Sequence, residues 1–192
     1  MTIRKNEIYT LTITDIGTHG EGIGKIDGYT LFVKNTLPEE EVKVLVVKAN
    51  KNYGYGKALE IIKPSPSRVE PLCPAAPRCG GCTLQHMDYK AQLIQKQNKV
   101  KQNIMRIGGF DNVDVEPTIG MDDPWNYRNK AQYPVSSDNK GINIGFYSLG
   151  SFRLVNIDNC LIGSKSDPEI LSLVRKFIEE NKIPVYNEET GK

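Results

Sequence analysis

The sequence has no long apolar run and only four cysteines among its 192 residues. No segment reaches the roughly 18 consecutive apolar residues that indicate a membrane-spanning helix, and the N-terminal residues lack the apolar core of a signal peptide. We therefore expect a cytoplasmic protein that has no membrane partner. Because structural disulfides are rare in that compartment, the four cysteines point to metal or redox chemistry.

The net charge of +2 is small, but it is unevenly distributed. Residues 1–62 carry eight basic and eight acidic side chains, whereas residues 63–107 carry eight basic side chains and only two acidic ones. Residues 108–192 carry nine basic and thirteen acidic side chains. The basic middle segment is a candidate surface for a polyanion. A solvated, lysine-rich helix explains the same pattern equally well.

The first third of the chain consists of short β-branched runs separated by glycine-rich breaks. The expected strands lie at residues 7–15, 29–34, 42–48 and 57–62, and Asp27-Gly28 is a hairpin signal. So many short strands predict a small closed barrel, because closure removes exposed strand edges. OB-like barrels of this size commonly bind RNA. A turn-rich linker follows at residues 63–68, and we place the first domain at residues 1–63.

Residues 68–192 mix helix and strand patterns and form the expected second domain. A helix is expected over about 88–107, with an apolar stripe that predicts buried packing against an unidentified partner, which could be a further domain. The clearest strands lie at 133–136, 142–147 and 153–157. Ser166-Asp167-Pro168-Glu169 predicts a helix start with a capping box, and 183–186 could form a further strand.

Three cysteines lie close together in the sequence, and the fourth lies far downstream. Five residues separate Cys73 from Cys79, two residues separate Cys79 from Cys82, and the remaining cysteine is Cys160. Four thiolates can complete a tetrahedral zinc site or hold a [4Fe–4S] cluster. This spacing favours the cluster, because all-cysteine zinc sites typically use two paired motifs. Zinc and four unrelated buried cysteines are the alternatives.

The segment CPAAPRCGGCTLQH at residues 73–86 resembles the cluster signature of the iron–sulfur RNA uracil-5-methyltransferases. In that family a TRAM domain, which is a small β-barrel, precedes a central domain that holds a [4Fe–4S] cluster. The segment HGEGIG at residues 19–24 resembles TRAM, YRNK at 127–130 and IGFY at 144–147 resemble the central domain, and Cys160 stands where the family has its fourth ligand. The resemblance implies a mainly β fold with α+β character: an OB-like TRAM barrel, then a small α+β cluster-binding domain.

The resemblance also implies transfer of a methyl group from S-adenosylmethionine to C5 of a uracil in RNA. In the family, a cysteine thiolate adds to C6 of the base and a general base later removes the C5 proton. Those groups belong to a C-terminal Rossmann-like domain, and this sequence has no strand followed by a glycine-rich S-adenosylmethionine loop. With all four cysteines assigned to the cluster, none is left as the nucleophile. We therefore expect a fragment without the catalytic domain, inactive by itself.

By resemblance the substrate is 23S rRNA, with tRNA as the alternative, and we expect a monomer. The candidate RNA-contacting residues carry a positive charge or an aromatic ring: Tyr53, Lys57, Arg128, Lys130, Phe146 and Tyr147. Phe146 and Tyr147 are neighbours in an expected strand, so one of the two should face the core. Arg128 and Lys130 are equally well explained as a solvated strand end.

Two other functions fit the same residues. One is a stand-alone RNA-binding or electron-transfer module that carries a cluster, and the other is a zinc-binding RNA module. An open reading frame that continues for about 200–250 residues, the size of a further domain, would exclude the stand-alone module.

Overall fold

The computed structural model describes residues 3–139 and 141–186, and the chain divides into two compact units. The first unit comprises Met1–Glu70 and Thr83–Ile119, and the second comprises Pro71–Cys82 and Gly120–Lys192. The expected second domain began at residue 68, whereas in the structure residues 83–119 group with the first unit. We call residues 71–82, which carry three of the four cysteines, the cysteine loop.

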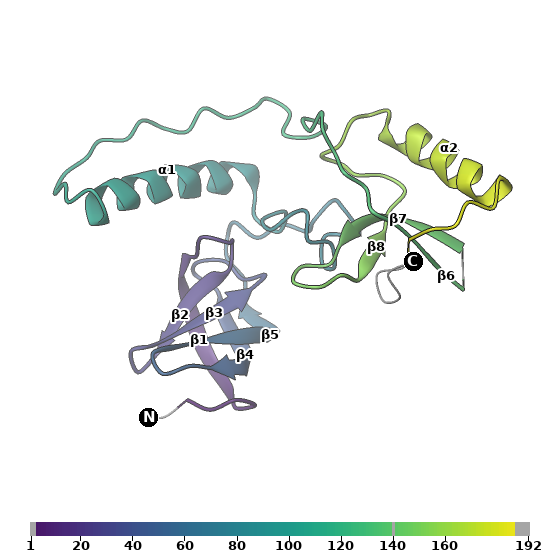
Figure 1. Ribbon diagram of the computed structural model, residues 1–192. Helices are drawn as coiled ribbons and strands as arrows, with labels where there is room; N and C mark the ends of the chain where they lie inside the picture. The colour runs from purple at the N-terminus through teal and green to yellow at the C-terminus, as the bar shows by residue number, and fades with distance from the viewer. Residues whose placement is uncertain (1–2, 140, 187–192) are drawn as a thin grey trace. The chain divides into compact units, whose positions relative to one another are not determined.

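Five strands of the first unit close into a barrel (Figure 1). They are β1 (Ile8–Ile16), β2 (Gly22–Ile26), β3 (Tyr29–Lys34), β4 (Glu41–Ala49) and β5 (Tyr53–Lys63). Their order around the barrel is β1-β2-β3-β5-β4, with a parallel β3–β5 pair and antiparallel pairs elsewhere. The predicted OB-like barrel and the mainly β, α+β fold class are therefore confirmed. Strand β5 begins at Tyr53 rather than at residue 57, because Gly54 and Gly56 hide the β pattern.

The barrel encloses an apolar core built from alternate strand residues. The residues with no exposed surface include Leu31 and Val33 of β3, and Val42, Val44 and Val46 of β4. This period of two is the pattern of a strand with one buried face. Each such side chain stabilises the folded state by about 1.5–3 kcal/mol through its burial.

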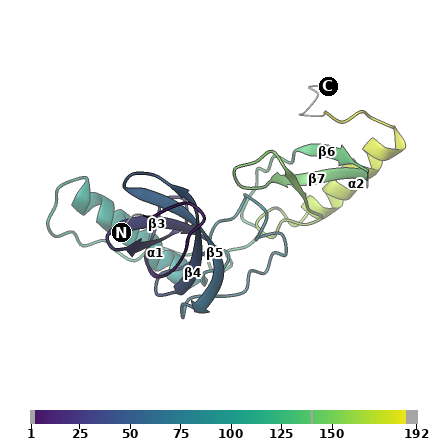
Figure 2. The same cartoon turned by 90° about the horizontal axis from the view of Figure 1, so that it is seen from below.

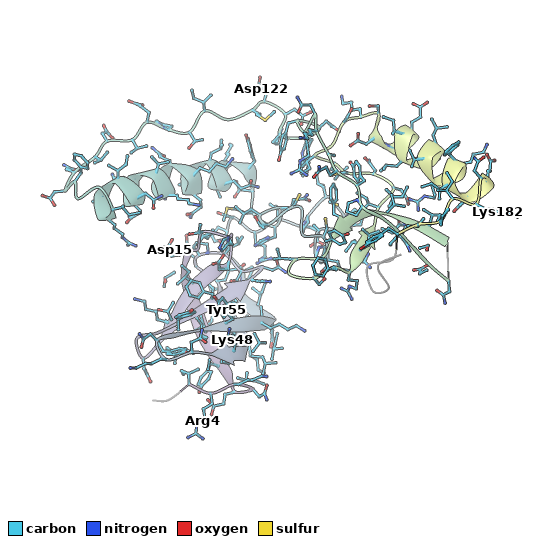
Figure 3. All side chains as sticks on the ribbon, viewed as in Figure 1. Arg4, Asp15, Lys48, Tyr55, Asp122 and Lys182 are labelled. Atoms are coloured by element: carbon cyan, nitrogen blue, oxygen red, sulfur yellow. The ribbon has the colours of Figure 1, made fainter. Side chains whose placement is uncertain are left out.

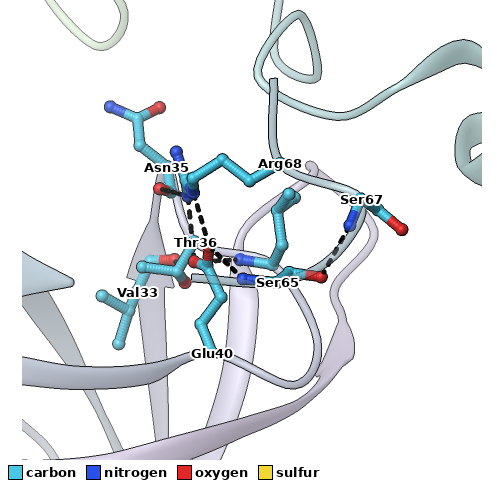
Figure 4. Close-up of polar contacts among 8 residues, drawn as sticks. Val33, Asn35, Thr36, Glu40, Ser65, Ser67 and Arg68 are labelled. Carbon is cyan, nitrogen blue, oxygen red and sulfur yellow. Dashed lines mark hydrogen bonds and ion pairs between the residues drawn. The ribbon is translucent and has the colours of Figure 1, made fainter. Parts of the chain in front are cut away.

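A buried carboxylate ties the chain that follows β5 to the barrel (Figure 4). Glu40 has no exposed surface and accepts hydrogen bonds from the backbone N–H of Leu37 at 2.9 Å and of Ser65 at 3.2 Å. The Arg68 guanidinium donates to both of its carboxylate oxygens and also, at 2.9 Å, to the Asn35 carbonyl. Burial alone would raise the pKa of Glu40, but the Arg68 hydrogen bonds and the two amides outweigh it and hold that pKa below its usual value.

A short backbone clip holds the two ends of the segment 70–85 side by side. The Val69 N–H donates to the His86 carbonyl at 3.0 Å, and the Asp88 N–H donates to the Ser67 carbonyl at 2.9 Å. His86 is buried here, and its Nε2 has no hydrogen-bond partner among the described residues. Burial lowers the pKa of His86, and the nearby Arg68 charge lowers it further.

Helix α1 (Tyr89–Arg106) begins at Asp88, whose side chain accepts from the Ala91 N–H at 3.0 Å. The extended segment that follows runs back along the helix (Figures 1 and 2). It is held by Gln97 Nε2, 2.6 Å from the Val115 carbonyl, and by Thr118 Oγ1, 3.0 Å from the Leu93 carbonyl. No residue of α1 is buried, so the apolar stripe finds no packing partner among the described residues, and a partner in a further domain stays a prediction.

The second unit contains a three-stranded sheet and one helix. Its elements are β6 (Val135–Asp138), β7 (Gly141–Tyr147), β8 (Leu154–Asn156) and α2 (Asp167–Glu180), with sheet order β6-β7-β8. Arg175 of α2 donates to the Ile142 carbonyl of β7, which ties the helix to the sheet. The predicted capping box is wrong, because the Ser166 side chain makes no cap hydrogen bond. Residues 183–186 are irregular and form no strand.

Neither α1 nor α2, the helices in the described part of the chain, combines the length and apolarity that crossing a membrane needs.

Candidate functional site

The cysteine loop is built from tight turns and is anchored to strand β7. Within it, the Ala76 N–H donates to the Cys73 carbonyl at 3.0 Å, and the Cys79 N–H donates to the Ala75 carbonyl at 2.8 Å. The Gly80 N–H then donates to the Tyr147 carbonyl at 2.9 Å. These bonds bring Cys79 to the end of the sheet, where it forms a bridge with Ser148.

Gly80 permits a close backbone approach at this point. A Cβ at this position would lie 2.7 Å from the Tyr147 carbonyl oxygen and 3.1 Å from the Leu149 nitrogen. Both contacts are with backbone, which cannot move aside easily. Gly81 instead turns its N–H toward the Cys79 sulfur at 3.3 Å, a donor of the kind that tunes metal-bound thiolates.

Cys160 follows β8 and joins the three loop cysteines in one apolar cluster. The buried members are Ala75, Val155, Ile157, Cys160 and Ile162; packed against them are Cys73, Cys79, Cys82, Trp125, Tyr133 and Phe146. A turn closed by the Gly163 N–H, which donates to the Cys160 carbonyl at 2.8 Å, positions the fourth cysteine. Cys160 lies 78 residues after Cys82 in the sequence, and yet all four cysteines belong to the same apolar cluster.

The cluster disfavours charge on the Cys79 thiol when no metal is present. Burial raises its pKa, and the neighbouring Cys73 and Cys160 raise it further. The Gly81 N–H and the Arg128 charge act in the opposite direction. A cation beside the Cys79 sulfur would favour the thiolate, which is the form that binds metal.

As the side chains stand, no three His, Cys, Asp or Glu side chains in the described ranges are placed to hold one metal ion. A tetrahedral zinc site would need thiolate sulfurs about 3.8 Å apart, since each Zn–S bond is about 2.3 Å. The four cysteines are thus gathered in one cluster but not closed around a single ion.

Arg128 lies beside the cysteine cluster, while Lys130 is exposed on irregular chain. The Arg128 N–H donates to the Ile162 carbonyl at 2.9 Å, which aligns residues 126–128 with the segment that carries Cys160. The positive charge of Arg128 lowers the pKa of Cys79, although burial keeps that pKa raised on balance. This placement suits charge compensation at the cysteines, and an RNA contact for either residue stays a prediction.

Phe146 and Tyr147 lie on opposite faces of β7, as their adjacent positions require. Phe146 packs into the cysteine cluster and stacks on Tyr133, with ring centroids 4.9 Å apart. Tyr147 packs edge-to-face on Phe152, at 6.0 Å. Phe146 is therefore the residue of the two that packs against the cysteines, and an RNA contact for Tyr147 stays a prediction.

On the barrel, Tyr53 and Lys57 point outward from β5 and are exposed. The parallel register sets Lys57 opposite Lys34 and Tyr55 opposite Phe32. Sequence reasoning missed Phe32, because only the β3–β5 pairing brings it to the two tyrosines. The alternating YGYGK pattern at residues 53–57 is the sequence signal that could have identified this face.

Comparison with known proteins links this architecture to RNA modification. Residues 4–59 match the TRAM domain family. An RNA methyltransferase of Clostridium tetani, named as uncharacterized, is 45% identical over 190 residues, covering 99% of this chain and 41% of the relative. A similarly named protein of Halalkalibacterium halodurans is 44% identical over 187 residues, covering 97% of this chain and 41% of the relative. The chain contains a TRAM domain and is homologous to RNA methyltransferases.

A solved structure extends the likeness to both units of the chain. It is the Pyrococcus abyssi tRNA (uracil-54, C5)-methyltransferase in complex with S-adenosyl-L-homocysteine. The likeness has a TM-score of 0.61 at 27% identity and covers 95% of this chain and 40% of that one. The chain therefore spans about two fifths of the length of the relatives it matches.

Proposed function

We propose that this chain is the RNA-binding, iron–sulfur part of an S-adenosylmethionine-dependent RNA uracil-C5 methyltransferase. The observation that carries the proposal is the likeness, over 95% of the chain, to a tRNA uracil-C5 methyltransferase. The TRAM match and the RNA methyltransferase relatives support the RNA substrate. Methyl transfer from S-adenosylmethionine belongs to the whole enzyme, and we expect this chain alone to be inactive.

The residues that would hold the cofactor are Cys73, Cys79, Cys82 and Cys160. Four thiols in one apolar cluster are the donor set of a [4Fe–4S] centre, which takes one cysteine at each iron. A bound cluster would supply a rigid anchor, since uracil methylation needs no electron transfer.

This chain's own residues would then hold and orient the RNA. The cysteine loop and the segments around Arg128 and Cys160 would become one rigid body around the cluster. Arg128 would compensate the negative charge of the thiolates. The barrel would bind RNA next to the target, so that one uridine is presented flipped out of its stack. We propose a cytoplasmic monomer with 23S rRNA as substrate and tRNA as the alternative, the substrate class of the Pyrococcus abyssi enzyme.

The cofactor is tested by purifying the chain without oxygen and measuring visible absorption, iron and zinc. A brown protein with about four irons per chain is expected for a cubane cluster. Replacing Cys160 by serine should reduce the iron content, whereas replacing the exposed Lys176 by alanine should not. One tightly held zinc and no iron would overturn the cluster and favour the zinc-binding RNA module.

The reaction is tested by deleting the gene that encodes this chain. Mass spectrometry of purified 23S rRNA and tRNA should then show the loss of one 5-methyluridine. Loss from 23S rRNA supports the main proposal, and loss from tRNA supports the alternative. No lost 5-methyluridine in either RNA would overturn the proposed activity.

A further inference from the structure

The outer surface of strands β3 and β5 carries three aromatic rings that touch one another. The Phe32 and Tyr55 centroids are 5.7 Å apart, and Tyr53 lies 5.9 Å from each of them. Their contacts are tilted or edge-to-face, the favourable geometries for aromatic pairs. We call Phe32, Tyr53 and Tyr55 the aromatic platform.

We propose that the aromatic platform is a stacking site for unpaired bases of a single-stranded RNA segment. The inference rests on the proposed RNA-binding function and narrows it to one face of the barrel and one class of RNA. Tyr53 and Tyr55 are 42% and 41% exposed, so neither ring is buried in the core of the barrel. Ring faces left in solvent are the surface on which bases stack in single-strand-binding barrels.

The charge around the platform suits RNA. Lys48 of β4 lies directly opposite Tyr55 in the register, and the two side chains lie next to each other on the barrel (Figure 3). Lys34 and Lys57 are paired across β3 and β5, two residues beyond the Phe32–Tyr55 pair. The surrounding stretches 29–34 and 45–59 contain no aspartate or glutamate. When the bases of a bound RNA stack on the rings, its phosphates would therefore lie near lysines and away from carboxylates.

The platform is held rigid from inside the barrel. Gly54 and Gly56 take the inward positions between the outward residues of β5. A Cβ would lie 2.7 Å from the Lys48 carbonyl oxygen at Gly54 and 2.2 Å from Val44 Cγ1 at Gly56. The two glycines therefore allow β5 to pack closely against β4. This close packing keeps the side chains of Tyr53 and Tyr55 directed outward.

The turn before Tyr53 is fixed as well. The Tyr29 hydroxyl lies 2.8 Å from the Asn50 carbonyl and 2.6 Å from the Tyr53 carbonyl, so its proton can bond either one. The Asn50 N–H also donates to the Tyr53 carbonyl at 2.9 Å. A surface ordered before binding loses less entropy when RNA arrives.

Stacking on the platform requires a base whose faces are free. In a duplex each face is covered by the neighbouring base pair, so a duplex offers the platform only its phosphates. The structure therefore predicts that this chain prefers single strands. It also predicts little dependence on base identity, because every base has an aromatic face.

The test uses the whole 192-residue chain. Its binding to a fluorescent oligouridylate of about 12 nucleotides, within the range of one such barrel, is measured by anisotropy and compared with a duplex of equal length. We expect tighter binding of the single strand. Phe32→Ala and Tyr55→Ala should each weaken it on the order of tenfold, the effect of losing one stacked base. Tyr55→Phe, which keeps the ring, should bind nearly as well as the unchanged chain.

Two further variants separate stacking from other effects. Ile8→Ala removes an exposed apolar side chain from β1 of the same barrel, outside the platform, and should bind normally. Lys57→Ala should weaken single strands and duplexes alike and reduce the dependence of log affinity on log salt by about one. Circular dichroism verifies that each variant is folded.

Each outcome has a separate meaning. Equal affinity for single strand and duplex, or normal binding by folded Phe32→Ala and Tyr55→Ala, overturns the platform but leaves the proposed methyltransferase role standing. Failure of the unchanged chain to bind either RNA overturns the RNA-binding role itself. Weakened binding in the alanine variants, with recovery in Tyr55→Phe, supports the platform.

Discussion

At the scale of single residues, a buried ion pair joins Glu40 to Arg68. A carboxylate without exposed surface is tolerated because Arg68 and two backbone amides satisfy it. Arg68 is the last residue of the linker at 63–68, so the pair holds the chain on the barrel before the cysteine loop begins. Because 28 residues separate Glu40 from Arg68, no local sequence pattern predicts this contact.

Removing Arg68 should destabilise the first unit strongly. Arg68→Ala leaves the Glu40 charge buried without its partner, and breaking a buried pair in this way costs about 3–5 kcal/mol. The expected result is a clearly lower urea midpoint for the loss of β-sheet circular dichroism. The exposed Lys176–Glu180 pair is the matched control, and Lys176→Ala should cost less than about 0.5 kcal/mol. Equal effects of the two substitutions would contradict the role given to Glu40.

Two buried groups should make stability fall on acidification, in two different windows. The pKa of Glu40 in the folded chain is held below 4.5. The stability that the ionised Glu40 contributes is therefore fully present above pH 4.5 and is lost as the pH falls through the lowered pKa. The pKa of His86 in the folded chain lies below 6.5. As the pH falls, the His86 imidazole is therefore protonated in the unfolded chain before it is protonated in the folded chain, and stability declines from pH 6.5 downward.

Urea unfolding measured from pH 8 to pH 3 checks both windows. Glu40→Gln should reduce the loss of stability below pH 4.5, where Glu7 also contributes, while leaving the loss that begins near pH 6.5. A profile of Glu40→Gln that matches the unchanged chain throughout would contradict the account of Glu40.

At the scale of elements, the cysteine loop depends on its contact with β7. Gly80→Ala would place a Cβ 2.7 Å from the Tyr147 carbonyl oxygen, so the loop or the strand has to shift. We expect a cost of about 1–3 kcal/mol, as for overpacking in a core. The neighbouring Gly81→Ala meets the Cys79 sulfur at 3.4 Å, an ordinary contact, and should be tolerated.

Denaturation followed by the fluorescence of Trp125 measures this difference, because that side chain packs against the cysteine cluster. A Gly80→Ala chain as stable as Gly81→Ala would show that the loop does not depend on β7 for its position.

At the scale of the whole molecule, the two units should respond differently to the cofactor. Trp125 is the single tryptophan and lies in the second unit, against the cysteines. Loading iron and sulfide should therefore quench its fluorescence and raise the unfolding midpoint that it reports, because a ligand that binds only the folded state stabilises it. The barrel core contains none of the cluster residues and should unfold at an unchanged midpoint.

Hydrogen exchange of the backbone amides of β1–β5 serves as the second probe, because it reports the barrel of the first unit separately from the second unit. A Cys160→Ser chain should show neither the quenching nor the stabilisation. If iron loading stabilises both units equally, the cluster is not confined to the second unit as proposed.

The sequence by itself was enough to predict the barrel and the α+β second part. It was also enough to predict that the four cysteines act together. Period-two patterns and glycine-rich turns are local signals, and strand formation follows from them. The cysteine motif indicated a resemblance to RNA methyltransferases before any fold was known, and homology to RNA methyltransferases is what the comparisons show. The iron–sulfur assignment itself stays a prediction, as do the substrate and the catalytic domain.

Only the tertiary structure decided which residues meet. Strand pairing brought Phe32 to Tyr53 and Tyr55, and burial brought Arg68 to Glu40. It also placed Phe146 in the cysteine cluster and left α1 without a buried face. The physical reason is that periodicity fixes which side of an element is apolar, whereas partner, register and burial depend on packing between segments far apart in the chain.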